Sequence, residues 1–110
     1  MNVLLLDTDD AVRAMLAEVL TLAGHEVTAA SSFADAAALG VPLPDVAIVS
    51  CCGVVDDAQR LASLGVAVIG LYCEDDCRAQ YPSGTLLLEK SWDTTDRLLS
   101  AVEMVGRVAA

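Results

Sequence analysis

Five short apolar runs, spread along the whole chain, constrain the fold of this sequence more than any other feature. A continuous apolar run of this length is consistent with a strand buried on both faces, as a parallel sheet covered by helices requires. Because aromatic residues make up only 4% of the chain, the core must be built largely from Ala, Val and Leu. The runs are Val3–Leu6, Val27–Ala30, Val46–Val49, Val66–Leu71 and Thr85–Leu88.

Segments with helical periodicity separate the apolar runs. In the first, apolar residues recur at i, i+3, i+4, i+7 and i+8, the stripe of an amphipathic helix. We expect this helix to end at Gly24, with Asp9 or Asp10 as its N-cap. A last helix carries apolar residues from Leu98 to Val105, with Ser91 or Asp93 as its cap. Two further helices are predicted between these, at Phe33–Leu39 and Asp56–Leu64. The polar segment Glu74–Ser83 has room for only a short helix.

Strands that alternate with helices through short connections predict a single α/β domain over residues 1–110. Five strands favour a flavodoxin-like (βα)5 three-layer sandwich, with a parallel sheet of order 2-1-3-4-5. A dinucleotide-binding half-fold would need a glycine-rich turn after the first strand, but the acidic run Asp7-Thr8-Asp9-Asp10 stands there and would repel a pyrophosphate. Function in such sheets gathers at the carboxyl ends of the strands. The residues expected there are Asp7, Thr8, Ser50, Tyr72 and Lys90.

The charge of the chain excludes several classes of partner. Asp and Glu total 16 against 6 Lys and Arg, so the formal net charge is -10. Such a chain repels phosphate backbones and anionic lipid, and we expect no direct binding to nucleic acid or to membranes. The N-terminus shows no targeting pattern, and four cysteines without a signal peptide are most simply reduced thiols. A cytoplasmic location is therefore expected.

Five segments, in order along nearly the whole chain, carry a resemblance to a known family. They are Val3–Arg13, Ala23–Val27, Pro44–Ser50, Val68–Cys73 and Leu88–Asp93. These segments resemble, in turn, the first strand with its acidic turn, the turn into strand 2, strand 3, strand 4 and the segment after strand 5 of response-regulator receiver domains, the signalling modules of two-component systems. The resemblance implies the flavodoxin-like fold and a phosphoryl site at the strand ends.

The resemblance also shows which parts of the receiver site are missing. In the family, two acids after strand 1 and an acceptor aspartate after strand 3 hold a magnesium ion, which allows the aspartate to attack phosphorus. Asp7 retains the first acidic position, but Thr8 occupies the second and Ser50 occupies the acceptor position. A serine hydroxyl cannot form an acyl phosphate and brings no charge to a metal. We expect weak or absent magnesium binding, with Asp7 and Asp9 as the weak metal candidates, and no other cofactor.

The positions that switch conformation in the family are altered as well. Tyr72 stands where a Thr or Ser normally bonds the phosphoryl group, and we expect it to fill or cover the pocket. Leu87 stands at the aromatic switch position and has no ring to swing. Lys90 is retained, but Ser91 replaces the following proline, so a trans peptide and a reshaped loop are expected there. The third and fourth helices are predicted to be shorter than is usual in the family.

The sequence leaves the role of several site residues open. Asp7 and Lys90 either form an ion pair across the pocket or are both solvated at the strand ends. Asp9 and Asp10 are expected to cap the helix rather than to bind metal. Ser50 is either a small polar end to a buried strand, a group that keeps the acceptor position uncharged, or a modified serine.

The cysteines and several outlying residues have both structural and functional interpretations. Structural thiols are favoured over a redox or zinc site, because the single histidine, His25, belongs to the opposite end of strand 2. Trp92 is either an interface anchor or a cover for the core. The acidic pairs within Asp56–Asp57 and Glu74–Asp76 are expected to be solvated. The cysteines are Cys51, Cys52, Cys73 and Cys77.

These expectations combine into a receiver-like signalling domain that is not an enzyme. Its main interpretation is a pseudo-receiver that is not phosphorylated at Ser50 and acts by protein–protein contact. One alternative is a phosphorelay receiver that is modified at a nonstandard residue, and another is a cysteine-based redox sensor. The expected partners are a histidine kinase, another regulator or an output domain, and homodimerisation is plausible by analogy with the family.

Overall fold

A computed structural model describes residues 1–40, 42–50, 55–72, 81–90 and 94–109 of the chain. The strands are β1 (Asn2–Asp7), β2 (Glu26–Ala30), β3 (Val46–Ser50), β4 (Ala67–Tyr72) and β5 (Leu86–Glu89). The helices are α1 (Asp10–Leu22), α2 (Phe33–Ala38), α3 (Val55–Ser63) and α5 (Thr94–Ala109). Every predicted strand is present, within two residues of its predicted bounds. The predicted polar segment between β4 and β5 lies mostly outside the described residues.

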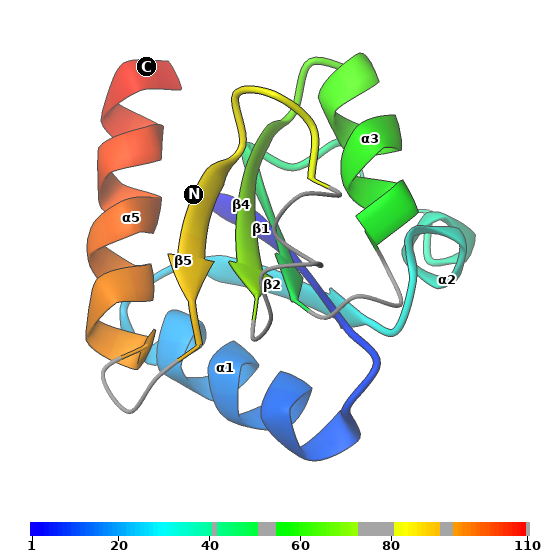
Figure 1. Cartoon of the computed structure of the whole chain (residues 1–110). Helices are drawn as coiled ribbons and strands as arrows, with labels where there is room; N and C mark the ends of the chain where they lie inside the picture. Colours follow the sequence, from blue (N-terminus) through cyan, green and yellow to red (C-terminus); the bar gives the residue numbers. More distant parts are fainter. Residues whose placement is uncertain (41, 51–54, 73–80, 91–93, 110) are drawn as a thin grey trace.

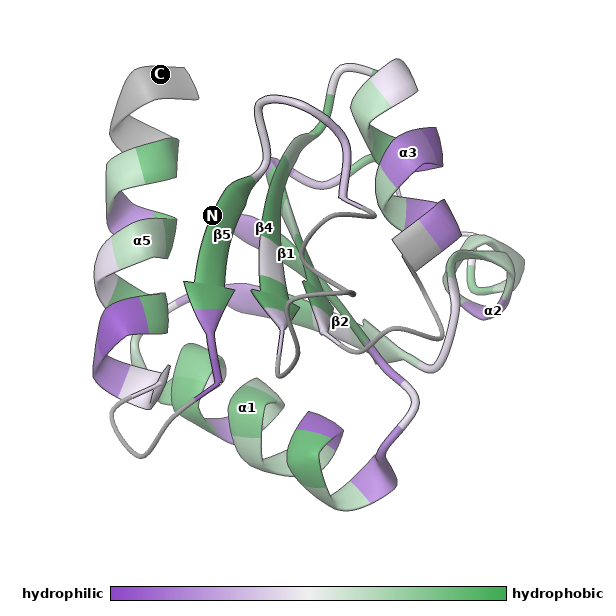
Figure 2. Ribbon diagram, in the orientation of Figure 1, coloured by the Kyte–Doolittle hydropathy of each residue, from purple (hydrophilic) through white to green (hydrophobic). Residues whose placement is uncertain are grey.

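The five strands form one parallel sheet in the order β2-β1-β3-β4-β5. Figure 1 shows helices on both faces of this sheet, with α1 and α5 on one side and α2 and α3 on the other. The strands are hydrophobic along most of their length in Figure 2, as burial on both faces requires. The predicted flavodoxin-like order and three-layer arrangement are therefore confirmed.

The alternation of side chains along the strands divides the core into two clusters. The cluster beneath α1 and α5 contains Leu5, Ile48 and Leu71, while the cluster beneath α2 and α3 contains Leu4 and Val49. Apart from Tyr81, the buried hydrophobic residues in the described part of the chain are all aliphatic, as the low aromatic content predicts. Within the described part of the chain, no helix is long and apolar enough to cross a membrane.

Helix α1 begins and ends at the predicted signals. The Asp9 side chain accepts hydrogen bonds from the backbone N–H groups of Ala11 and Val12, at 3.0 and 3.1 Å, so Asp9 is the N-cap. At the other end Gly24 has a φ of 96°, a backbone conformation that favours glycine. The Asp9 cap sets the turn that carries β1 into α1, and therefore the surroundings of Asp7.

The start of α2 depends on a residue from α3. Ser32 caps α2 by accepting a hydrogen bond from the N–H of Asp35, and the N–H of Phe33 donates to Asp57 Oδ2 at 2.9 Å. The expectation that Asp57 is merely solvated is therefore wrong: the residue is half-buried and completes the cap of a neighbouring helix. Asp56, in contrast, is exposed as predicted.

Replacing Asp57 by alanine should lower the free energy of unfolding by about 1 kcal/mol, the typical effect of losing a helix cap. Urea unfolding followed by circular dichroism would measure this loss. Asp56→Ala removes the same charge from an exposed neighbour and serves as the matched control, with an expected change below about 0.5 kcal/mol. Equal effects of the two substitutions would contradict the tertiary cap.

Candidate functional site

The carboxyl ends of β1 and β3 place Asp7 directly opposite Ser50 in the sheet. Both residues are 0% exposed, and they are the only buried polar or charged residues among the described ones. Because Leu5 and Ile48, two positions earlier, belong to the cluster beneath α1 and α5, strand alternation directs Asp7 and Ser50 to the same face. The structure thus brings together two of the predicted site residues.

The carboxylate of Asp7 has different surroundings at its two oxygens. Oδ1 accepts a hydrogen bond from the backbone N–H of Asp9 at 2.9 Å. Oδ2 lies 3.8 Å from the Nζ atom of Lys90, whose side chain is 27% exposed. The two residues therefore form an ion pair in which the anion is fully buried and the cation reaches solvent, and the alternative of two solvated side chains is wrong.

A second cation holds the backbone at the same strand end. The guanidinium of Arg13 donates from Nη1 to the carbonyl oxygen of Asp7 at 2.8 Å, and Nη2 bonds Asp10 Oδ1. Arg13 is one helical turn into α1, so this contact ties the helix to the end of β1. Two cationic groups therefore lie close to Asp7, a feature that the sequence analysis did not identify.

The buried polar atoms of the site are incompletely paired. Within the described residues, Asp7 Oδ2 and Ser50 Oγ make no hydrogen bond. Thr8, next to Asp7, is exposed, and Asp9 uses Oδ1 in capping α1. In the described ranges no three His, Cys, Asp or Glu side chains gather where they could hold a metal ion. Among the residues that the structure describes, the buried potential ligands at the strand ends are thus the Asp7 carboxylate, the Ser50 hydroxyl and backbone carbonyls.

The opposite face of the sheet from Asp7 carries Tyr72 and Leu87, the two residues that the resemblance assigns to switch positions. Tyr72 and Leu87 are half-buried and pack against the cluster beneath α2 and α3. The carbonyl oxygen of Tyr72 accepts a hydrogen bond from the N–H of Lys90 at 2.7 Å, which joins the ends of β4 and β5. This bond fixes the backbone from which the Lys90 side chain extends toward Asp7.

Tyr81 is the residue of this region that sequence reasoning missed. It is 8% exposed, and its hydroxyl lies 2.8 Å from the carbonyl oxygen of Val49 and 3.2 Å from that of Leu71. Its ring covers Gly70, where an added Cβ would lie only 2.7 Å from the ring. A Gly in an otherwise apolar strand is a sign of close approach, and this signal could have identified the contact.

Several predicted residues cannot be placed at the site. The four cysteines, Ser91 and Trp92 lie outside the described residues, as does the Glu74–Asp76 acidic run. His25 precedes β2 and therefore belongs to the amino-terminal edge of the sheet, as predicted. The interpretations of the cysteines and of Trp92 stay predictions.

Comparisons with known proteins identify the fold. No family model matches the sequence, and neither does any curated protein. A response regulator receiver protein from Sinorhizobium medicae is 20% identical, with a TM-score of 0.76 over 100% of this chain and 97% of its own. A response regulator receiver modulated diguanylate cyclase from Pelobacter carbinolicus is 21% identical, with a TM-score of 0.79 over 98% of this chain and 93% of its own.

A third similar structure is considerably longer than this chain. NtrX from Brucella abortus is 18% identical, with a TM-score of 0.73, and the match covers 98% of this chain but 27% of the NtrX chain. This chain therefore corresponds to about a quarter of that protein. The shared feature in all three comparisons is the five-stranded fold described above, at an identity too low to transfer individual residues.

Proposed function

We propose that this chain, which has the fold of response-regulator receiver domains, is a pseudo-receiver that signals by protein contact without accepting a phosphoryl group at Ser50. The observation that carries the proposal is the strand-end site itself, in which a lysine neutralises a buried carboxylate opposite a serine. The domain acts as a signalling module and not as an enzyme.

Magnesium does not fit the residues present. Mg²⁺ prefers an octahedral set of oxygen ligands with one or two carboxylates, usually supplemented by substrate phosphates. Here Asp7 is the only buried carboxylate at the described strand ends, and Lys90 already balances its charge. A metal ion would therefore have to displace an ammonium while gaining only a hydroxyl from Ser50 and an exposed Thr8.

Phosphoryl transfer to the acceptor position is equally disfavoured. Ser50 has no carboxylate with which to form an acyl phosphate, and its side chain is 0% exposed. Its hydroxyl would need a general base, and the nearest acid along the ladder, Asp7, is held by Lys90 and by the Asp9 N–H. A phosphoryl donor would also bring negative charge to a site whose residues do not fit the magnesium ion that would balance it.

The switch positions support a conformation fixed by sequence. Tyr72 and Leu87 are packed against the core, and Tyr81 holds the carbonyl groups at the ends of β3 and β4. A domain of this kind presents one surface to its partner at all times. We propose a histidine kinase, another regulator or an output domain as that partner, and a homodimer as a further assembly.

NMR titration with magnesium and beryllofluoride tests the proposal. We expect no saturable shifts at Asp7, Ser50 or Lys90 at millimolar metal, and no mass gain after incubation with acetyl phosphate. Saturable shifts at these residues, or addition of one phosphoryl group, would overturn it and favour a receiver modified at a nonstandard residue.

The double variant Thr8→Asp, Ser50→Asp is the matched gain-of-function control. It places two further carboxylates beside buried Asp7, so mutual repulsion should destabilise the metal-free protein. Binding of magnesium should restore the lost stability. We expect its melting temperature to rise with magnesium concentration, whereas that of the unaltered protein stays constant. A response of the unaltered protein equal to that of the double variant would contradict the proposal.

A further inference from the structure

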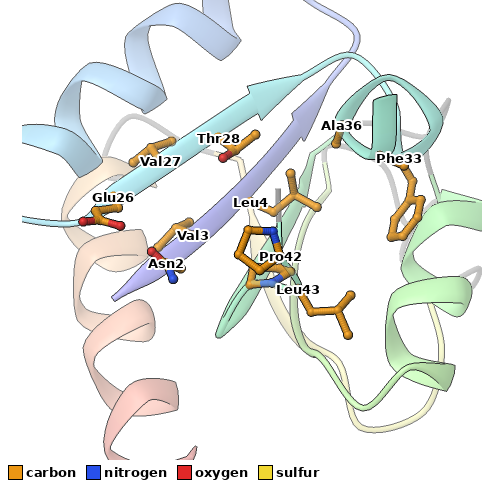
Figure 3. A pocket seen from close by; sticks show the side chains of 12 residues that line it. Asn2, Val3, Leu4, Glu26, Val27, Thr28, Phe33, Ala36, Pro42 and Leu43 are labelled. Atoms are coloured by element: carbon orange, nitrogen blue, oxygen red, sulfur yellow. The ribbon is translucent and has the colours of Figure 1, made fainter. Parts of the chain in front are cut away.

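A groove lies between β2 and α2. It includes the amino-terminal ends of β1 and β2, whereas Asp7 lies at the carboxyl end of β1. Its volume is about 370 Å³, and the side chains of Leu4, Thr28 and Ala36 are among those that line it (Figure 3). The loop that leads into β3 closes one side with Pro42 and Leu43. We refer to this feature as the β2–α2 groove.

The shortness of α2 accounts for the groove. Its six residues extend for about 9 Å, whereas the five residues of β2 extend for about 16 Å. Helix α2 begins three residues after the end of β2 and packs beside that strand. A helix this short covers only part of the strand, and apolar residues beside it line the groove.

The walls of the groove combine apolar surface with negative charge. Leu43 is 56% exposed, Phe33 is half-buried, and Leu4 forms a buried apolar floor. Glu26 is the single titratable side chain among the described lining residues, none of which is Lys or Arg. Asp45, next to the lining residue Pro44, adds a second exposed carboxylate at the same edge.

We infer that the β2–α2 groove receives a segment of a partner protein that carries an apolar side chain beside a basic one. The apolar side chain would cover Leu4, Phe33 and Leu43, and the basic one would face Glu26. A net charge of -10 attracts a basic segment, and the groove itself carries the exposed Glu26 with Asp45 nearby, so a basic partner segment suits this groove better than the acidic surface of a second copy. The inference rests on the proposed function in requiring a protein partner.

The openness of the groove favours a segment of protein over a small molecule. Pockets for small ligands bury most of the ligand surface. Five of the lining residues are themselves exposed, so the groove is open to solvent. These residues are Asn2, Glu26, Ala37, Pro42 and Leu43.

NMR titration of the full chain with a short synthetic peptide that alternates lysine and leucine tests the inference. At an ionic strength of about 0.15 M, where distant charges are screened, we expect saturable shifts at Thr28, Phe33 and Leu43. The same peptide with serine in place of leucine should bind at least about tenfold more weakly, because the apolar burial is lost. Equal binding of both peptides would show attraction by charge alone and overturn the inference.

Matched variants locate the binding surface. Glu26→Lys should weaken binding by at least about fivefold, while Glu18→Lys, at an exposed position of α1 on the other face, should change it by less than about twofold. Leu43→Ser should likewise weaken binding more than Leu22→Ser, which alters another exposed leucine. Equal losses within either pair would overturn the inference.

Two further outcomes separate this inference from the proposed function. Tighter binding of hexylamine than of the lysine–leucine peptide would assign the groove to a small amphiphile and would contradict a protein segment. Shifts at Asp7, Ser50 or Lys90 in the magnesium titration would overturn the pseudo-receiver proposal alone, because that site lies at the other end of the strands.

Discussion

Replacing Tyr81 by alanine should lower the free energy of unfolding by about 3–5 kcal/mol, the range for deleting a large aromatic side chain from a core. The ring is 8% exposed and lies over Gly70, and its hydroxyl bonds strand carbonyl groups at the ends of β3 and β4. Urea unfolding followed by circular dichroism would measure the change. Tyr81→Phe removes only the hydroxyl and should cost about 1–2 kcal/mol.

The contact with Gly70 gives this prediction its control. Gly70→Ala places a Cβ 2.7 Å from the Tyr81 ring, so the ring must move, at a cost of about 1–3 kcal/mol. In the Tyr81→Ala background the ring is absent, and the same substitution should be neutral or slightly stabilising because alanine suits a strand better than glycine. Additive effects of the two substitutions would show that the residues are not in contact.

Replacing Lys90 by methionine should lower the free energy of unfolding by about 2 kcal/mol, because the fully buried Asp7 carboxylate loses its counter-charge. The expected loss is smaller than for a fully buried pair, since Lys90 is 27% exposed and the separation is 3.8 Å. Methionine retains most of the alkyl chain, so the lost charge accounts for the change. Thermal and urea unfolding would measure it.

The double variant Asp7→Asn, Lys90→Met tests the cause of that loss. An amide at position 7 can still accept the hydrogen bond from the Asp9 N–H but carries no charge, so the double variant should recover at least half of the stability lost in Lys90→Met. Arg60→Met, which removes an exposed cation from α3, should change stability by less than about 0.5 kcal/mol. A Lys90→Met effect no larger than that of Arg60→Met would contradict the buried ion pair.

Local sequence patterns were sufficient for most of the fold. Each strand is a continuous apolar run, and α1 has its own periodicity and capping residue, so these elements could be located without long-range information. The bounds differ at the ends: β1 extends to Asp7 and β3 to Ser50, because the buried ladder continues into residues whose side chains are polar. A polar residue marks the end of an apolar run in the sequence. A strand, however, ends where its hydrogen-bonded pairing with the neighbouring strand ends.

The site was only partly predictable, for a related reason. The residue types at positions 7, 8, 50 and 90 could be read from the sequence, together with the absence of two carboxylates. Whether Asp7 is paired or solvated depends on where the end of β5 places Lys90. No local sequence pattern encodes the distance between the Asp7 carboxylate and the Lys90 ammonium. Arg13 was overlooked because a helical arginine is usually a surface charge, and its contact with the Asp7 carbonyl follows from the angle at which α1 leaves the sheet.

By itself the sequence determined the alternation of strands and helices and the parallel order of the sheet, since these follow from residue type and spacing. Its resemblance to receiver domains implied an uncharged residue, Ser50, at the acceptor position. The tertiary structure alone decided the contacts between distant segments. Tyr81 reaches the carbonyl of Val49 across 32 residues, and Asp57 caps the helix at Phe33 across 24. Burial of Asp7 beside Lys90 and the groove beyond the short α2 likewise arise only when separate elements pack, because packing sets distances that no local pattern contains.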